Sequence, residues 1–543
     1  MQRKMYADPA SVFVHDAILE SCRRSPEKVA VIDTSGPAPR CFTYAEYATL
    51  VEDAARGLVG SGIRPGEVVG IYLPNWWEYA VAYHAATLAG AIPTPLNPSY
   101  REREVRYQIE NSEAVALITD GTLVSGMNLS GMPSLRRVYS VRTDAPSCER
   151  FSSVLHSNAA PLPPTTAASN ETLAALPYSS GTTGLPKGVM LSHHNLVANV
   201  FQLLGDPEKP VFAADEIVMC VLPLYHIYGL NVVLNPVLVR GATLVLVPRF
   251  DTAEVLKTII QFGVTMLPVV PPMLSAFCVA AEKGLFPRDH AVRWVKCGAA
   301  PLAPELAHRF TDLTGIRIRQ GYGMTEASPV THVGCLEEGP YRPESIGWPV
   351  AQTDCKVLND QGDDARADEA GELVMRGPQF MIGYWKSPAA TAAALRDGWY
   401  WSGDVVRRDE YGLYYVVDRR KEMIKYKGFS VAPAEIESVL LEHPAVRDCG
   451  VVGKPDTVAA KSLQPSWCWT RIILNRRNSK SNWPVLWRSA WPTTSNLARS
   501  TSFRRYHIRL RARYCAGNYA ERSRQWPTEL LQRFRAYAKR PCR

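Results

Sequence analysis

The sequence predicts an α/β protein of two or more domains, in which helices cover parallel sheets. At 543 residues the chain is too long for a single hydrophobic core. Buried-strand patterns alternate with amphipathic helical patterns, which is typical of parallel sheets with helical connections. Both patterns stop after Lys461, so we expect the second domain to be incomplete.

The N-terminal elements follow one another in this alternating rhythm. Thr43 and Glu46 form a capping box before the amphipathic run 44–60, which predicts a helix there. Further predicted elements are a buried strand at 68–73, a helix at 77–89 that ends at Gly90, a charged helix at 101–112, and strands at 114–119, 244–247 and 264–270. Residues 158–170, rich in Pro, Thr, Ala and Ser, predict an exposed lead-in to the segment that follows.

Composition excludes several classes of protein. No apolar stretch reaches about 18 residues without a charge or a proline, so no transmembrane segment is predicted. The N-terminus carries Arg3 and Lys4 but no apolar region of a secretory signal. The twelve cysteines are scattered without a Cys-x-x-Cys pair. This pattern favours a cytoplasmic protein over a disulfide framework or a zinc site.

The formal net charge of +9 belongs to the end of the chain. Residues 462–543 hold 18 Lys and Arg against 2 Asp and Glu. The remaining residues hold 43 basic and 50 acidic side chains, a net charge of −7. A nucleic-acid partner would therefore depend on this tail alone, and we predict none.

Residues 178–193 form the most informative segment, Tyr-Ser-Ser-Gly-Thr-Thr-Gly-Leu-Pro-Lys-Gly-Val-Met-Leu-Ser-His. Small residues let the backbone approach a polyanion, and their N–H and O–H groups together with Lys187 can bind phosphate oxygens. The segment is not a Walker A loop, because Pro186 stands in place of the second Gly and Gly188 in place of Ser or Thr. The alternative is an ordinary flexible surface loop.

This segment resembles the phosphate loop of the adenylate-forming superfamily, which includes acyl-CoA and aryl-CoA synthetases, luciferases and the adenylation domains of peptide synthetases. Further motifs of that family occur in its order at 222–229, 297–302, 320–326, 371–373, 401–404 and 418–428. The resemblance covers roughly residues 10–461. The sequences of the motifs are most similar to those of 4-coumarate–CoA ligases and fatty acyl-CoA ligases.

The resemblance implies an AMP-forming acid–thiol ligase. A carboxylate would attack the α-phosphate of ATP to give acyl-AMP and pyrophosphate, and the thiol of coenzyme A would then displace AMP. The implied cofactors are ATP, Mg²⁺ and coenzyme A, and the substrate is a fatty or aryl carboxylic acid. Acyl-AMP ligases that feed a carrier protein are the alternative, although the interval 327–371 leaves no room for their usual insertion.

The resemblance also assigns roles to individual residues. Residues implied to hold the β- and γ-phosphates are Ser179, Ser180, Gly181, Thr182, Thr183, Gly184 and Lys187. Thr325 would donate to the α-phosphate, and Glu326 would carry Mg²⁺, a cation that prefers carboxylate oxygen. The motifs around the adenine contain Gly298, Ala299, Ala300, Gln320, Gly321, Tyr322 and Gly323. Ordinary packing at a helix start is the alternative for the two alanines.

The remaining implied residues surround the sugar and the acyl group. Asp404 and Arg419 would bind the ribose. Lys425, Lys427 and Gly428 would face the site in the thioester-forming pose, although such a charge run also suits a solvated face. His226 would lie beside the acyl pocket, with a buried core histidine as its alternative. The implied catalytic residues are Lys187, Thr325, Glu326, His226 and Lys425.

The chain changes character after Lys461. The last 82 residues carry six of the 13 Trp, 16 Arg and no Asp, which is unlike a packed α/β domain. Translation in another reading frame explains this usage. If one base was lost before the codon for Ser462, the original frame can encode a strand, an acidic helix and the family's Pro-x-Gly-Lys ending. The codon of that lysine would span the present codons of Ala512 and Arg513. A genuine basic, disordered tail is the alternative.

The resemblance implies a large N-terminal domain of sheets covered by helices, 1–417, which binds AMP, and a small α+β C-terminal domain after a hinge at Asp418. Residues 418–461 form the start of this second domain, which is therefore incomplete. Within the latter we predict a helix from Pro433 and a strand at 446–452. Residues 462–543 would form an off-frame, disordered tail. The family's C-terminal lysine has no counterpart in the chain as written, so we expect impaired adenylation or a degenerate nucleotide-binding remnant.

Overall fold

The computed structural model describes residues 12–146, 148–155, 160–164, 168–179, 185–205, 213–334, 342–419, 424–426, 429–431, 446–455, 467–476 and 485–488, with side chains up to Asp418. The chain divides into two compact units. The first contains residues 1–356, 374–402 and 409–415, and the second contains 357–373, 403–408 and 416–543. The domain limits at residues 417 and 461 stay a prediction.

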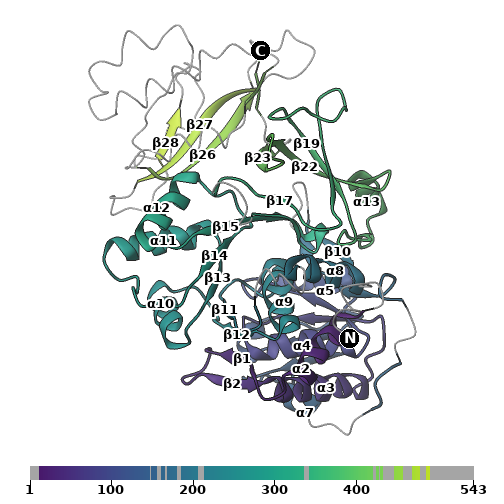
Figure 1. The fold of residues 1–543 in the computed structure, drawn as a ribbon. Helices are drawn as coiled ribbons and strands as arrows, with labels where there is room; N and C mark the ends of the chain where they lie inside the picture. The colour runs from purple at the N-terminus through teal and green to yellow at the C-terminus, as the bar shows by residue number, and fades with distance from the viewer. Residues whose placement is uncertain are drawn as a thin grey trace, which may run out of the picture. The chain divides into compact units, whose positions relative to one another are not determined.

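A five-stranded parallel sheet lies in the first unit (Figure 1). Its strands, in spatial order, are β4 (Ile92–Pro95), β3 (Val68–Ile71), β5 (Ala116–Thr119), β6 (Arg137–Ser140) and β7 (Glu149–Arg150). The four residues of β3 and of β5 are all buried. Their continuous apolar runs fit a sheet covered on both faces.

A nine-stranded sheet provides the frame of the candidate site. Its order is β17 (Trp348–Pro349), β16 (Val330–Val333), β15 (Ile318–Gly323), β14 (Trp294–Cys297), β13 (Met266–Val269), β11 (Ile217–Cys220), β12 (Thr243–Leu246), β1 (Val29–Asp33) and β2 (Arg40–Thr43). The central pairs are parallel, whereas β2, β16 and β17 pair antiparallel at the two edges. The carboxyl ends of β14 and β15 therefore lie side by side, which is where open α/β sheets bind ligands.

Smaller antiparallel pairings complete the first unit. Strand β10 (Lys187–Ser192) pairs with β8 (Leu173–Ala175), β9 (Tyr178–Ser179) and β20 (Gly383–Tyr384). Strand β21 (Leu395–Arg396) pairs with the first residues of β22 (Trp399–Arg408). The remaining strands before residue 420 are β18 (Asp354–Leu358), β19 (Ala370–Arg376) and β23 (Tyr414–Arg419).

The described helices connect and cover these strands. They are α2 (Val14–Arg24), α3 (Tyr44–Gly60), α4 (Trp77–Leu88), α5 (Glu102–Ser112), α6 (Gly121–Val124), α7 (Phe151–Leu155), α8 (His193–Leu204), the π-helical η2 (Gly229–Leu234), α9 (Asn235–Arg240), α10 (Thr252–Gln261), α11 (Pro271–Glu282), α12 (Pro304–Thr314), the 3₁₀-helical η3 (Thr325–Ala327) and α13 (Pro388–Ala394).

Helix α4 is buried along its length because it lies between sheets. Every residue from Trp77 to Thr87 is buried, and the helix contacts strands of both the five-stranded and the nine-stranded sheet. A helix that is apolar on all sides requires such a place in the interior. The core of the first unit is thus a stack of sheets with helices between and around them.

The structure confirms the predicted α/β class and the predicted N-terminal elements. Helix α3 begins with the capping box, in which Thr43 accepts the Glu46 N–H and Glu46 accepts the Thr43 N–H. Gly90 follows α4 with a φ of 76°, a conformation that favours glycine. Of the predicted lead-in at 158–170, residues 160–164 and 168–170 are described, and Ser169 there is buried rather than exposed.

The second unit contains the strands β24 (Ile424–Tyr426) and β25 (Phe429–Val431), which pair with each other. It also contains an antiparallel sheet of β26 (Val446–Pro455), β27 (Trp467–Arg476) and β28 (Val485–Arg488). Strand β26 confirms the strand predicted at 446–452. Strands β27 and β28 fall within the predicted disordered tail, whereas the helix predicted from Pro433 lies outside the described residues.

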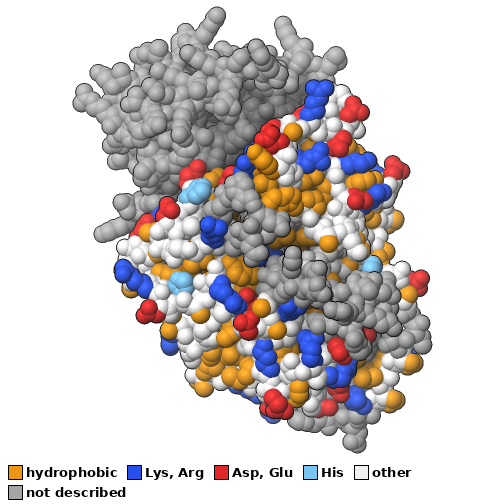
Figure 2. Space-filling view, viewed as in Figure 1, with side chains coloured by type: hydrophobic (Ala, Val, Ile, Leu, Met, Phe, Trp, Pro, Cys, Tyr) orange, Lys and Arg blue, Asp and Glu red, His pale blue; other side chains and the backbone are white. Residues whose placement is uncertain are grey.

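Charged side chains of both signs lie on the face of the described residues that is in view (Figure 2). Figure 2 shows Lys and Arg interspersed with Asp and Glu on the face in view, rather than gathered by sign. Within the described residues, no helix combines the length and the apolar character needed to cross a membrane.

Candidate active site

Glu326 lies in a tight turn at the carboxyl end of β15. The turn can close only because residue 323 is glycine, since a Cβ there would meet the Pro329 carbonyl oxygen at 2.1 Å. The Met324 N–H donates to that same carbonyl oxygen at 3.0 Å. The turn therefore brings Thr325 and Glu326 back over the sheet edge.

Two buried asparagines hold this turn from the helical side. Asn199 of α8 bonds both backbone groups of Val330, and Asn231 of η2 donates to the Ser328 carbonyl oxygen at 2.5 Å. Both asparagines are fully buried. Because buried amides are stable only when paired, they fix the backbone that carries Glu326.

The Glu326 side chain is 8% exposed and accepts two hydroxyl donors. Ser179 Oγ donates to Oε1 at 3.0 Å, and the Tyr384 hydroxyl donates to the same oxygen at 2.8 Å. Among the described residues, Oε2 has no hydrogen-bond donor. Within the described residues, the carboxylate is thus anchored by one oxygen only.

Lys187 begins strand β10 directly opposite Ser179 of β9. Its ammonium lies 5.3 Å from the centre of the Tyr384 ring, within the range of a cation–π contact. No ion pair of Lys187 occurs within the described part of the chain. The structure thus brings together Ser179, Lys187 and Glu326 as predicted, whereas Ser180, Gly181, Thr182, Thr183 and Gly184 lie outside the described residues.

Two glycines let the ends of β14 and β15 lie close to Tyr228 and Lys296. A Cβ at Gly298 would meet the Gly321 carbonyl oxygen at 3.1 Å and the Tyr228 ring at 3.5 Å. A Cβ at Gly321 would meet the Lys296 side chain at 3.5 Å. Glycine at both positions therefore permits this close approach, since a side chain would contact Tyr228 or Lys296.

Ala299 and Ala300 follow Gly298 and are exposed. Ala299 has a φ of 67°, which is uncommon for a residue with a Cβ. Such strain tends to occur at ligand sites. Exposed side chains argue against ordinary helix-start packing, and the binding of adenine there stays a prediction.

Lys296 is a buried cation that the sequence analysis missed. It is 7% exposed, and its ammonium makes no hydrogen bond or ion pair with the described residues. Burial, with the nearby Arg319 charge, lowers its pKa to about 7. A ligand atom that accepts a hydrogen bond from Lys296 Nζ would favour the charged form of this lysine.

Gln320 is held by the segment 342–348, and Tyr322 packs against His332 of β16. The Gln320 amide donates to the carbonyl oxygens of Pro343 and Ser345 at 3.2 and 3.1 Å. The Tyr322 ring lies edge-on to His332, with 5.8 Å between ring centres. Gln320 thus supports the strand rather than presenting its amide to a ligand.

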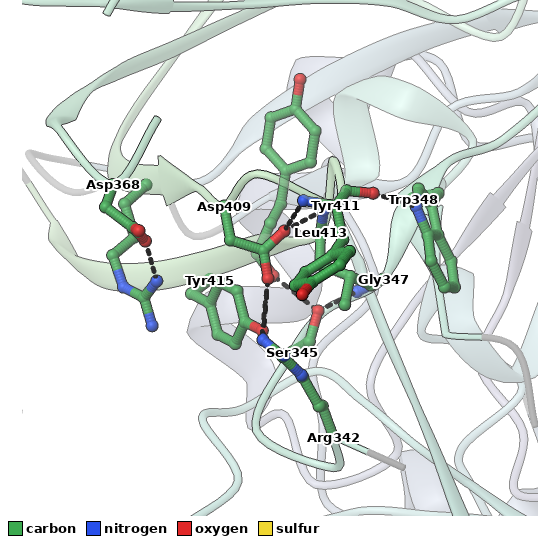
Figure 3. A network of polar contacts seen from close by, with 11 residues as sticks. Arg342, Ser345, Gly347, Trp348, Asp368, Asp409, Tyr411, Leu413 and Tyr415 are labelled. Carbon is green, nitrogen blue, oxygen red and sulfur yellow. Dashed lines mark hydrogen bonds and ion pairs between the residues drawn. The ribbon is translucent and has the colours of Figure 1, made fainter. Parts of the chain in front are cut away.

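A polar network fixes this segment in turn (Figure 3). Arg342 donates to Asp409 at 3.0 Å, and the Tyr415 hydroxyl donates to the same carboxylate oxygen at 3.0 Å. Ser345 donates its hydroxyl to the Tyr414 carbonyl oxygen at 2.9 Å. The carboxyl end of β15 therefore rests on a rigid support.

His226 is exposed, which is against the alternative of a core histidine. Its Nδ1 accepts the Tyr228 N–H at 3.1 Å. The protein atoms around the ring nevertheless lower its pKa by desolvation. A side chain that solvent reaches but neighbouring atoms desolvate suits the wall of a recess, next to Tyr228.

The remaining predicted residues belong to the second unit. Asp404 is 6% exposed in β22 and Asp418 is 7% exposed in β23. Arg419 is the last residue of β23, and Lys425 lies in β24. The side chains of both residues are not described. Lys427 and Gly428 lie outside the described residues. The roles of these residues stay predictions.

The donor set fits a cation shared with a nucleotide. Within the described residues, no group of three or more His, Cys, Asp or Glu side chains could hold a metal alone. Mg²⁺ commonly uses one or two carboxylates together with substrate phosphates. Glu326, with one oxygen anchored and the other available, matches that requirement.

Tyr384 is a second residue that the sequence analysis missed. It lies 58 positions from Glu326, and no local pattern marks it. The pairing of β20 with β10, through Val189 and Tyr384, brings it to the site. Only knowledge of this long-range pairing could have identified it.

Comparisons with known proteins agree with this geometry. A family model described as AMP-binding enzyme matches residues 18–385, and a model described as AMP-binding enzyme C-terminal domain matches residues 435–463. The 4-coumarate–CoA ligase 5 of Oryza sativa subsp. japonica is 36% identical over 460 residues, which cover 83% of this chain and 84% of that protein.

Solved structures show the same fold. The anthranilate CoA ligase AuaEII in complex with anthranoyl-AMP has a TM-score of 0.75 at 23% identity, covering 90% of this chain and 89% of that one. The O-succinylbenzoate coenzyme A synthetase (MenE) of Bacillus subtilis, in complex with ATP and magnesium ion, has a TM-score of 0.71 at 25% identity and covers 91% and 95%.

Proposed function

This chain belongs to the AMP-binding enzyme family, and on that premise we propose that its substrate is an aromatic carboxylic acid with a polar group on the ring. The lineage is that of ATP-dependent, AMP-forming acid–thiol ligases that use coenzyme A. The residues around Tyr228 are the basis for proposing which carboxylic acid this chain uses.

Lys296 carries this proposal. Gly298 and Gly321 lie beside Tyr228 and Lys296 and carry no side chain, and we place the ring of the substrate next to them. The Lys296 ammonium would then donate to a hydroxyl or other oxygen on the ring. An aliphatic chain would leave this buried cation without an acceptor, so a fatty acid is the less favourable substrate. The 4-coumarate–CoA ligases and the anthranilate ligase act on aromatic acids by their names.

Binding of stable acyl-AMP mimics tests the substrate class without requiring turnover. We expect 4-coumaroyl sulfamoyl-adenosine to bind at least about tenfold more tightly than the cinnamoyl mimic, which lacks the hydroxyl, because a hydrogen bond to a charged donor is lost. The decanoyl mimic should bind more weakly still. Lys296→Met should abolish the preference between the first two mimics, and equal affinities in the unsubstituted protein would contradict the proposal.

The roles of the polar residues follow from their positions. We propose that Ser179 and Lys187 bind the terminal phosphates of ATP and that Thr325 donates to the α-phosphate. Glu326 would hold Mg²⁺, which would neutralise phosphate charge as pyrophosphate leaves. His226 would line the recess through which the thiol approaches. Preorganised donors suit this chemistry because negative charge gathers in the transition state.

We further propose that the chain as written binds ATP but forms acyl-AMP slowly. The C-terminal family match ends at residue 463, two residues after the change in composition at Lys461. The resemblance implies a lysine near the end of the C-terminal domain that contacts the α-phosphate, and none stands in that context here. Losing one such donor typically costs about 10²–10³ in rate.

Restoring the reading frame after Lys461 tests this second proposal. Pyrophosphate release should rise by about 10²-fold or more, whereas the affinity for ATP should change little. A restored chain that binds ATP and remains as slow would point to a degenerate nucleotide-binding remnant. Thioester formation on addition of coenzyme A separates the acyl-CoA ligase from an acyl-AMP ligase that feeds a carrier protein.

A further inference from the structure

The two oxygens of the Glu326 carboxylate are in different surroundings. Oε1 accepts the Ser179 and Tyr384 hydroxyls at 3.0 and 2.8 Å. Oε2 receives no donor from the part of the chain that the structure describes. A carboxylate held in this manner cannot rotate freely, because rotation would break both hydrogen bonds.

Tyr384 contacts both charges of the phosphate site. Its hydroxyl donates to Glu326, and the Lys187 ammonium lies over its ring at 5.3 Å. Burial, followed by the Glu326 charge, raises the pKa of the Tyr384 hydroxyl above its ordinary value. The hydroxyl therefore stays a neutral donor over the whole physiological pH range.

The backbone of Tyr384 is firmly placed. Strand β20 pairs with β10 through Val189, and the Tyr384 N–H donates to the Thr391 hydroxyl at 2.9 Å. Close by, the Met381 N–H donates to the Glu326 carbonyl oxygen at 2.8 Å. The strand that carries the tyrosine is thus bonded both to the strand of Lys187 and to the turn of Glu326.

Lys187 and Glu326 are opposite charges near one tyrosine, yet they form no ion pair within the described structure. If they paired, each would have to be released before a nucleotide and its cation could bind. The contacts of Tyr384 offer both groups another partner. The ring interacts with the ammonium and the hydroxyl interacts with one carboxylate oxygen.

We propose that Tyr384 is a positioning residue that keeps Lys187 and Glu326 apart and fixes Oε1 so that Oε2 remains available to a nucleotide-bound divalent cation. This inference rests on the proposed cation-binding role of Glu326. Tyr384 belongs to neither the phosphate-loop motif nor the Thr-Glu motif, and no contact with the nucleotide is proposed for it.

The cation dependence of nucleotide binding tests the proposal. The dissociation constant of a non-hydrolysable ATP analogue is measured by calorimetry on the full chain, with and without Mg²⁺. The ratio of the two constants is the magnesium gain. We expect Tyr384→Phe to lower this gain about tenfold, the size of one hydrogen bond to a charged group. The affinity without Mg²⁺ should stay unchanged, because the ring beside Lys187 is retained.

A second substitution removes the ring as well. Tyr384→Leu should also weaken binding without Mg²⁺, since Lys187 and Glu326 could then pair with each other. Tyr72→Phe is the matched control, because it removes a hydroxyl that donates to the Tyr100 carbonyl oxygen at 2.7 Å. It should leave both dissociation constants unchanged.

Combination with Glu326→Gln separates the possible failures. Glu326→Gln alone should abolish most of the gain, and a retained gain would overturn the cation-binding role itself. If that variant loses the gain but Tyr384→Phe keeps it, only the role of Tyr384 is overturned. Tyr384→Phe should have no further effect in the Glu326→Gln background, and an additive loss would contradict action through the carboxylate.

Folding is monitored by the thermal unfolding midpoint of each variant. If Tyr384→Phe fails to fold, Ser179→Ala decides the question, because Ser179 donates to the same oxygen. A reduced magnesium gain in Ser179→Ala supports the fixing of Oε1. A gain equal to that of the unsubstituted chain overturns it.

Discussion

Asn199 binds both backbone groups of Val330. Its side-chain Nδ2 donates to the Val330 carbonyl oxygen at 2.7 Å, and its Oδ1 accepts the Val330 N–H at 3.0 Å. One helix residue, 131 positions away in sequence, thereby holds the strand that closes the turn of Glu326. The Glu326 carboxylate is thus positioned by an amide that does not touch it.

Asn199→Ala should destabilise the protein and weaken nucleotide binding together. The substitution leaves two buried backbone groups without partners, each of which costs about 1–3 kcal/mol. We expect the free energy of unfolding in urea to fall by about 2–5 kcal/mol. The exposed Asn128→Ala should change it by less than about 0.5 kcal/mol. A stable Asn199→Ala variant with full nucleotide affinity would show that the turn of Glu326 keeps its conformation without Asn199.

Local sequence signals predicted the elements whose causes are local. The capping box of Thr43 and Glu46 lies within one helical turn, and the strand of residues 68–71 is a continuous apolar run. Ser179, Lys187 and Glu326 could be named because they belong to motifs of a family. These features need no knowledge of which strands pair.

The rest of the site depends on pairing between distant segments. Tyr384 reaches Glu326 only because β20 pairs with β10. Lys296 lies in a short apolar run, Trp-Val-Lys-Cys, and is buried on a strand that pairs with β13 on one side and β15 on the other. A sequence pattern shows neither the strand order nor which lysine lacks a partner, so both residues escaped prediction.

Gly323→Ala should remove nucleotide binding while retaining most of the fold. The new Cβ would lie 2.1 Å from the Pro329 carbonyl oxygen, a distance that only movement of the turn can relieve. Calorimetry with an ATP analogue should show at least about a tenfold loss of affinity. Gly334→Ala is the matched control, because its nearest contact would be an ordinary 3.4 Å. If both variants bind alike, the turn tolerates displacement.

Stability should fall between pH 7 and pH 4 because of buried neutral histidines. Burial lowers the pKa of His332 to about 3 and that of His84 to about 4. In the unfolded chain these groups bind protons near pH 6.5. Their contribution is therefore fully present above about pH 6.5 and is lost as the pH falls toward 3 or 4.

Each such histidine changes the free energy of unfolding by up to about 1.4 kcal/mol per pH unit in this window. His332→Gln should therefore reduce the slope of the unfolding midpoint against pH, even if the midpoint at pH 7.5 is lower. The exposed His308→Gln should retain the original slope. An unchanged slope in His332→Gln would mean that the His332 ring takes up its proton without unfolding.

Arg142 should be essential for stability, because it compensates two buried carboxylates. It donates to Glu78 at 2.7 Å and to Asp33 at 2.9 Å, and these acids are 4% and 2% exposed. Arg142→Leu leaves both charges uncompensated, for which we expect a loss of about 3–5 kcal/mol in the free energy of unfolding. Arg150, which forms an exposed ion pair with Asp144, is the control. Arg150→Leu should leave the unfolding midpoint unchanged.

The pH dependence of the Arg142→Leu variant identifies the cause of its loss. Burial already raises the pKa of Glu78 even with Arg142 in place, so without the arginine this carboxyl should take up a proton more readily. The deficit relative to the unsubstituted chain should therefore shrink between pH 8 and pH 5, and Glu78→Gln should recover part of it at pH 8. A deficit that is constant with pH would instead assign the loss to the packing of Arg142 over the Trp76 ring, 4.0 Å from its centre.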